Sequence, residues 1–223
     1  MSIAIDRLVR SKRKTIAVII QPDGTLMVRA PLRASNLHIR EFIQDHADWI
    51  RRKQAQAKGS PPPPKKNFRN GETFLYLGKE FPLKVVTPGR PALSFRNNTF
   101  LLSKTFLPKA SQVFSQWYKD RSREVISGRV ASWAKPDLFA YKKIRITSAR
   151  TRWGSCSTSG TLSFTWRLLM APLEIVDYVV LHELVHTRVK NHSRAFWQMV
   201  GEYMPEYKTY VRWLKQNGKY LTI

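Results

Sequence analysis

One segment in the last quarter of this 223-residue chain constrains the fold more than any other feature. It follows Pro172, which suits the first position of a helix, and from Ile175 it reads IVDYVVLHELVH without glycine or proline. Apart from Asp177, the residues from 175 to 181 are apolar, which is typical of a helix that is buried nearly all round. The rest of the chain must enclose this helix, and each polar residue within it needs a specific reason.

The polar residues at the end of this segment are His182, Glu183 and His186. Residues i and i+4 lie on one face of a helix, so His182 and His186 can bind the same metal ion. Glu183 projects about 100° around the helix from His182. There it can reach a water molecule on the metal without being a ligand. The pattern predicts a zinc-dependent hydrolase with Glu183 as its general base.

A third ligand is expected, because a catalytic zinc site uses three protein ligands and leaves one position for water. His192 follows His186 by six residues, and Asn191 before it can adopt the left-handed conformation that ends a helix. We expect this turn to bring His192 to the metal, and Ser193 to cap a following helix. The alternative is a helix whose histidines are satisfied by ordinary hydrogen bonds.

Composition excludes a disordered chain, because 43% of the residues are hydrophobic and 12% are aromatic. The chain has 39 basic and 15 acidic residues, and the net charge of +24 is unevenly spread. Residues 1–100 carry +12, residues 101–150 carry +8 and residues 151–223 carry +4. We therefore expect the first two thirds of the chain to contact a polyanion such as a nucleotide or nucleic acid. The alternative is that the positive charge only keeps the surface soluble.

The sequence also indicates where the protein works. No apolar run approaches the roughly 18 residues that a membrane span requires, so we expect no membrane partner. The single cysteine, Cys156, excludes an internal disulfide and fits a reducing compartment. We expect a cytoplasmic protein.

The pattern of apolar residues predicts both strands and helices along the chain. The expected elements are a β-hairpin at 15–31, a helix at 35–58, strands between 72 and 103, a helix at 109–134, and strands at 144–150 and 161–169. Four consecutive prolines at 61–64 must be extended, which indicates a linker or a surface strap. We expect an N-terminal basic, β-rich region at 1–103 with one helix, and a catalytic region at 104–223.

The loop TRWGSCSTSG, which precedes the buried helix, contains further candidates. Arg150 and Arg152 could donate hydrogen bonds to a substrate or to a developing oxyanion. Alternatively, Trp153 packs inward and Gly154 only permits a turn. Cys156 as a fourth ligand would close the zinc site, so a small buried thiol is the favoured interpretation.

Two blocks resemble the YgjP-like metallopeptidase family, a zincin group related in its core to SprT-like proteases. They read TRWGSCSTSGTLSFTWRLLMAP and IVDYVVLHELVHTRVKNHSRAFW. The resemblance implies zinc ligands at His182, His186 and His192, a catalytic Glu183, and a peptide or protein substrate. Thr165 departs from the family pattern, which has Asn there. The expected fold is α+β, with a zincin-like core in which the HExxH helix packs on a mixed or antiparallel sheet.

Two rival functions remain open from the residues alone. Zinc-activated water beside arginines would serve equally well to hydrolyse a nucleoside triphosphate at the phosphoanhydride. A nucleic-acid-binding module would explain the charge and the aromatic residues interleaved with Arg and Lys, although no RNA- or DNA-binding motif is present.

Overall fold

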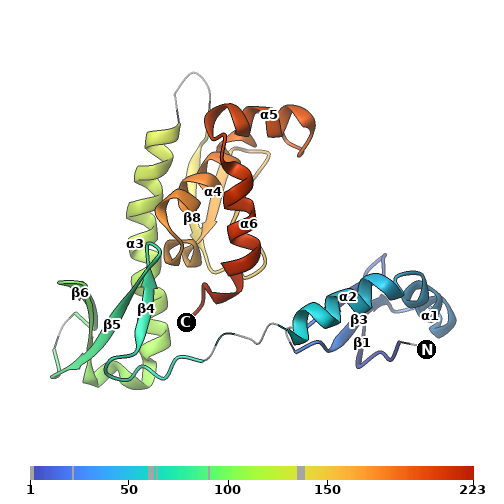
Figure 1. Ribbon diagram of the computed structural model, residues 1–223, viewed down its shortest axis with the longest axis horizontal. Coiled ribbons are helices and arrows are strands. Elements are labelled where there is room, and N and C mark those ends of the chain that lie inside the picture. The colour runs from blue at the N-terminus through green and yellow to red at the C-terminus, as the bar shows by residue number, and fades with distance from the viewer. Residues whose placement is uncertain (1–2, 22, 60–62, 64, 90, 135–138) are drawn as a thin grey trace. The chain divides into compact units, whose positions relative to one another are not determined.

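The computed structural model describes residues 3–21, 23–59, 63, 65–89, 91–134 and 139–223 (Figure 1). The chain divides into two compact units, residues 1–64 and 65–223, each with its own hydrophobic core. Among the described residues are six α-helices, ten β-strands and three short 3-10 helices, so the fold is α+β as expected. None of the described helices combines the length and the apolar character needed to cross a bilayer.

The first unit is a three-stranded sheet with two helices. Its elements are β1 (Arg7–Ser11), β2 (Ala17–Ile20), β3 (Leu26–Pro31), α1 (Asn36–Asp45) and α2 (Ala47–Lys58). The strand order is β1-β3-β2, with β3 parallel to β1 and antiparallel to β2, which confirms the expected hairpin. Leu26, Val28 and Ala30 alternate along β3 and are buried in the core with apolar residues of both helices. The opposite face of the sheet is therefore turned away from the helices.

The second unit contains two mixed sheets. The first has the order β4-β5-β7-β6 and is formed by β4 (Thr73–Tyr76), β5 (Lys79–Val86), β6 (Leu93–Arg96) and β7 (Thr99–Ser103). The second has the order β8-β10-β9 and is formed by β8 (Lys143–Thr147), β9 (Gly154–Cys156) and β10 (Thr161–Thr165). In the second sheet β10 is parallel to β8 and antiparallel to β9, which leaves β9 as an edge strand.

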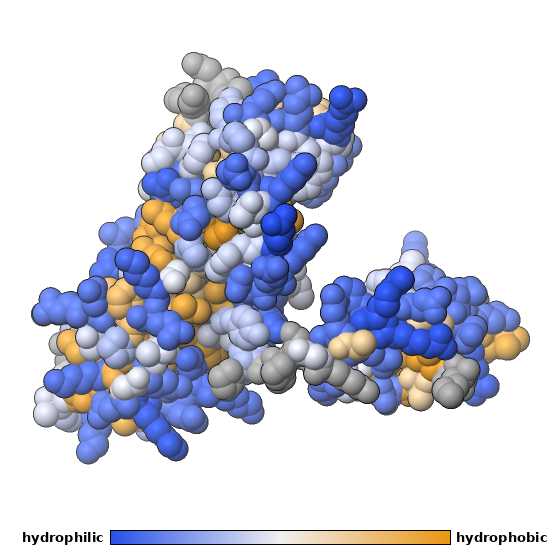
Figure 2. Space-filling view, viewed as in Figure 1, coloured by the Kyte–Doolittle hydropathy of each residue, from blue (hydrophilic) through white to orange (hydrophobic). Residues whose placement is uncertain are grey.

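Four helices complete the second unit. They are α3 (Ala110–Trp133), α4 (Leu173–Val185), α5 (Arg194–Tyr203) and α6 (Tyr207–Asn217). Helix α4 contacts α3, α5, α6 and β9, and in Figure 1 it lies between α3 and α6. Ten of its thirteen residues are buried, so the rest of this unit encloses it as its sequence predicts. Figure 2 shows hydrophilic side chains over most of the visible face, with hydrophobic patches on both units.

Several expectations about boundaries differ from the structure. The expected helix at 35–58 is two helices that meet at His46, whose ring Nδ1 lies 2.8 Å from the carbonyl oxygen of Phe42. Residues 166–169 of the last expected strand belong instead to a 3-10 helix, Trp166–Met170. The boundary expected at 103 and 104 falls inside the second unit, because the β4–β7 sheet shares one core with α3. Of the four prolines at 61–64, only Pro63 lies within the described residues.

Candidate metal centre

Helix α4 is held at both its start and its middle. Pro172 is the N-cap rather than the first helical residue, and its carbonyl oxygen accepts hydrogen bonds from the backbone of Ile175 and Val176. Asp177, the one acidic residue in the apolar stretch, receives two hydrogen bonds from Arg129 on α3, at 2.5 and 2.7 Å. This pair fixes α4 against α3. It also explains why a buried helix contains an acidic residue, because a buried carboxylate is stable when it is paired and hydrogen-bonded.

Three imidazoles converge at the end of α4. The Nε2 atom of His192 lies 3.0 Å from that of His182 and 3.2 Å from that of His186. Two nitrogen ligands on a tetrahedral zinc ion, each about 2.0–2.1 Å from the metal, lie about 3.3 Å apart. Among the described His, Cys, Asp and Glu side chains, only this group of three could hold one metal ion. The spacing and chemistry of these donors fit zinc.

The protonation of the histidines also suits a metal. Nδ1 of His186 lies 3.0 Å from the carbonyl oxygen of Val189, which can only accept, so this nitrogen carries the proton and Nε2 keeps its lone pair. Burial and the neighbouring His186 and His192 lower the pKa of His182 to about 3. Burial is also the main cause that lowers the pKa of His186. The rings of His182 in α4 and of His186 at its C-cap are therefore neutral at pH 7, as metal ligation requires.

One aromatic side chain supports all three imidazoles. Phe196 on α5 is fully buried, and its ring centroid lies 4.9 Å from that of His182, 4.5 Å from that of His186 and 4.7 Å from that of His192. Sequence periodicity places Phe196 on the apolar face of a helix but gives no sign of this contact. Its role depends on how α5 folds back on α4, which no local pattern specifies.

The route to His192 differs from the expected one. Helix α4 ends at Val185, because Thr187 donates to the carbonyl oxygen of Leu184 through both its backbone and its hydroxyl group and tightens the last turn. Asn191 is not in the left-handed conformation, and its side chain accepts a hydrogen bond from the backbone of Ser193 instead. Ser193 is the N-cap of α5 as expected, although its side chain makes no capping bond there.

Glu183 directly follows His182 in α4 but does not belong to the group of three converging histidines. It is only 4% exposed, and its Oε2 atom has no hydrogen-bond partner. Burial raises the pKa of Glu183 to about 8, although the charge of Arg152 opposes this shift. A buried carboxylate oxygen without a partner is costly in a structural position. It is the arrangement expected of a group that exchanges a proton with a water molecule.

Gly154 on the edge strand β9 makes room for this carboxylate. A Cβ atom at residue 154 would lie 2.5 Å from Oε1 of Glu183, 2.6 Å from its Cγ and 2.8 Å from its Cδ. The glycine therefore serves close packing against Glu183, not only the turn that its sequence context indicates. The sequence signal for Gly154 is that it lies in one of the two blocks that carry the family resemblance, and the HExxH segment lies in the other.

The other candidate residues that the sequence singles out in this region do not form one group. The charge of Arg152 acts on Glu183, whereas that of Arg150 acts on Arg167. Cys156 lies outside the group of histidines and is half-buried, and burial raises the pKa of its thiol. Thr165 is buried, and its hydroxyl donates to the carbonyl oxygen of Ala149 at 2.8 Å. Thr165 therefore ties the arginine-containing loop to β10.

Three comparisons with known proteins bear on this site. The family model "YgjP-like, metallopeptidase domain" matches residues 14–217, a range that includes the three histidines and Glu183. Among solved structures, the crystal structure of the metallopeptidase zymogen of Pyrococcus abyssi abylysin is similar over 42% of this chain and 92% of that chain. The identity is 22% and the TM-score is 0.34. No protein of curated function matches the chain significantly.

Proposed function

Because this chain belongs to the YgjP-like metallopeptidase family, we propose that it is a zinc-dependent peptidase that cleaves peptide or protein substrates. The observation that carries the proposal is the convergence of the Nε2 atoms of His182, His186 and His192 near Glu183, whose buried Oε2 atom has no hydrogen-bond partner. Three nitrogen donors leave the fourth position of a tetrahedral site open, as catalytic zinc sites do.

The chain's own residues then divide the work of hydrolysis. His182, His186 and His192 would hold the zinc ion, which when bound would polarise a water molecule and the substrate carbonyl. The positive charge of a bound ion would lower the pKa of Glu183 from its value of about 8. The resulting carboxylate would accept a proton from the attacking water and donate it to the leaving amine. Its low exposure keeps bulk water from competing for the proton. Arg152, whose charge acts on Glu183, would stabilise negative charge on the carbonyl oxygen.

Strand β9 provides a way to hold an extended peptide. It is an edge strand of its sheet, it contacts α4, and its residue Gly154 packs against Glu183. A peptide that pairs with the free edge of β9 would gain backbone hydrogen bonds and pass close to the proposed metal position. Its scissile bond would then lie next to the general base.

The test is hydrolysis of an unstructured protein by the purified full-length chain, followed by gel electrophoresis and mass spectrometry. Cleavage should stop when a chelator removes the metal and return when one equivalent of zinc is added. Nucleoside triphosphates should be assayed in parallel, since the same metal chemistry could act on a phosphoanhydride. Release of phosphate or pyrophosphate without any peptide cleavage would favour that alternative and overturn the peptidase assignment.

A second activity concerns the first unit, for which we propose polyanion binding. Residues 1–64 carry 12 basic and 5 acidic side chains. Arg7 and Arg29 are exposed, and strand register places both on the sheet face opposite the buried Leu26, Val28 and Ala30. An open sheet face with two arginines is suited to a phosphate backbone.

We also propose a reducing, cytoplasmic location for the protein, because its single cysteine, Cys156, is free.

A further inference from the structure

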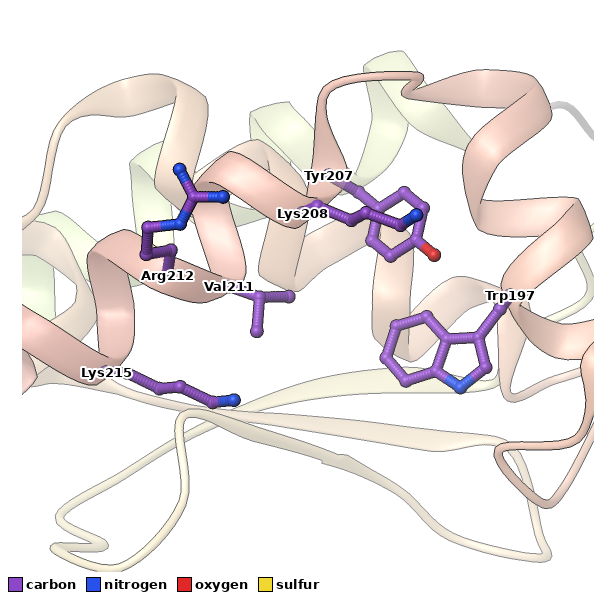
Figure 3. Close-up of a pocket in the computed structure, with 6 residues that line it drawn as sticks. All are labelled: Trp197, Tyr207, Lys208, Val211, Arg212 and Lys215. Carbon is purple, nitrogen blue, oxygen red and sulfur yellow. The ribbon is translucent and has the colours of Figure 1, made fainter.

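We propose that a basic cavity beside the histidine group is a specificity pocket for an acidic side chain of the substrate, a role that rests on the proposed peptidase function. The cavity has a volume of about 440 Å³. It is lined by Trp197 on α5 and by five residues in or at the start of α6, namely Tyr207, Lys208, Val211, Arg212 and Lys215 (Figure 3).

Three cations dominate the polar lining of this cavity. Lys208, Arg212 and Lys215 are spaced at i, i+4 and i+7, which places them on one face of α6. Like charges at this spacing repel one another and destabilise a helix. Among the ion pairs of the described residues, none includes any of these three side chains. No acidic residue lines the cavity, so an anion from outside would relieve the repulsion.

The aromatic wall connects the cavity to the proposed metal position. The ring centroid of Trp197 lies 5.6 Å from that of His192 and 6.0 Å from that of His182. The ring of Tyr207 stacks on Trp197 at 5.4 Å with an interplanar angle of 16°. Because an extended chain advances about 3.3 Å per residue, a side chain within about two residues of the scissile bond can reach the cavity.

The lining suits a carboxylate carried on a short aliphatic stem. The guanidinium group of Arg212 can donate two parallel hydrogen bonds to a carboxylate, and the two lysines add point charges. Trp197, Tyr207 and Val211 offer apolar surface to the methylene groups of a glutamate, and they lower the local dielectric around the charge. A neutral glutamine of the same shape would lose the charge-assisted bonds.

The experiment compares peptides that differ only in charge. Starting from one cleaved peptide, Glu or Gln is placed in turn at each of the three positions on either side of the scissile bond. At one of these positions the parent protein should cleave the Glu peptide about tenfold faster in kcat/KM, since one charge-assisted hydrogen bond is worth about that factor. Equal rates for Glu and Gln at all six positions would overturn the pocket.

Variants of the lining identify the source of the preference. Arg212→Gln should reduce the Glu preference several-fold, and Arg212→Glu should reverse it in favour of a Lys peptide. Lys84→Gln on the exposed face of β5 is the matched control, because it removes one charge from the same unit outside the cavity and should leave the preference unchanged. A preference that survives Arg212→Glu unaltered would contradict the proposal.

A binding measurement separates failure of the pocket from failure of the peptidase. Fluorescence anisotropy of labelled Glu and Gln peptides is measured with the Glu183→Gln variant, which should bind without cleaving. Tighter binding of the Glu peptide, lost in Glu183→Gln/Arg212→Gln, supports the pocket even if the parent cleaves no peptide. Equal binding of both peptides, or displacement by a nucleoside triphosphate but not by the free Glu peptide, would overturn it.

Discussion

Gly154 and Glu183 lie so close that residue 154 cannot carry a side chain without moving the carboxylate: a Cβ atom there would lie 2.5 Å from Oε1 of Glu183. The two residues are 29 positions apart in sequence, on an edge strand and on the buried helix. Their contact links the β9–β10 hairpin to the proposed general base. Because of this contact, a substitution of Gly154 can shift the side chain of Glu183 without altering any ionisable group.

Gly154→Ala should therefore act as a positioning variant. The added methyl group displaces the side chain of Glu183, and we expect kcat/KM to fall by at least about tenfold because small misplacements of a catalytic group are costly. The proposed ligands are untouched, so zinc content should stay at the parent level. Gly128→Ala is the control, since a Cβ at Gly128 on α3 meets nothing within 4 Å. Parent activity in Gly154→Ala would show that the contact with Glu183 does not matter for catalysis.

Glu183→Gln should separate catalysis from metal binding. Glutamine keeps the size of the side chain but cannot accept the proton of water, so peptide hydrolysis should fall by at least ~10²-fold. Zinc content should not fall, because Glu183 is not one of the three converging donors. The thermal unfolding midpoint should not fall either, because glutamine cannot take the charged form that burial disfavours at this position. Turnover at the parent rate would exclude Glu183 as the base.

The pair between Arg129 and Asp177 should contribute to stability through the position of α4. Asp177 has an exposed side-chain fraction of 13%, and Arg129→Ala leaves it unpaired among apolar residues. We expect the free energy of unfolding to fall by about 2 kcal/mol in urea denaturation. Arg121→Ala breaks the exposed pair with Glu124 and should cost less than about 1 kcal/mol. Equal losses of unfolding free energy in both variants would show that the pair between Arg129 and Asp177 contributes no more to stability than an exposed pair.

Polyanion binding by the first unit should depend strongly on salt. Titration of labelled single-stranded DNA into the full-length chain at two salt concentrations gives the slope of log affinity against log salt, expected near −0.7 for each phosphate contacted. Arg7→Gln/Arg29→Gln should make this slope shallower, and Lys84→Gln should affect it less. Absence of binding at low salt would leave the positive charge as a solubility feature of the surface.

Much of the site could be predicted from local patterns. The buried helix follows from its apolar residues, and the grouping of His182 with His186 follows from their spacing at i and i+4. The turn between β6 and β7 follows from Asn97 and Asn98, which both adopt positive φ as their residue type favours. These features depend on a few neighbouring residues, so the sequence specifies them directly.

The features that escaped prediction depend on distant contacts. Arg129 pairs with Asp177 across 48 positions, and Phe196 supports the histidines only because α5 folds back on α4. The end of α4 at Val185 depends on the hydroxyl of Thr187 competing for a backbone carbonyl. The basic cavity likewise exists only where α6 meets Trp197. In each case tertiary structure adds a partner that a periodic pattern does not reveal.

The most direct test of the account is the zinc content of the purified chain and its variants, measured by elemental analysis on protein of known concentration. We predict one zinc ion per chain in the parent and in Glu183→Gln, and almost none in His186→Ala, because removing one of three converging donors collapses a tetrahedral site. Stoichiometric zinc in His186→Ala, or its absence from the parent after reconstitution, would contradict the metal centre on which the proposed function depends.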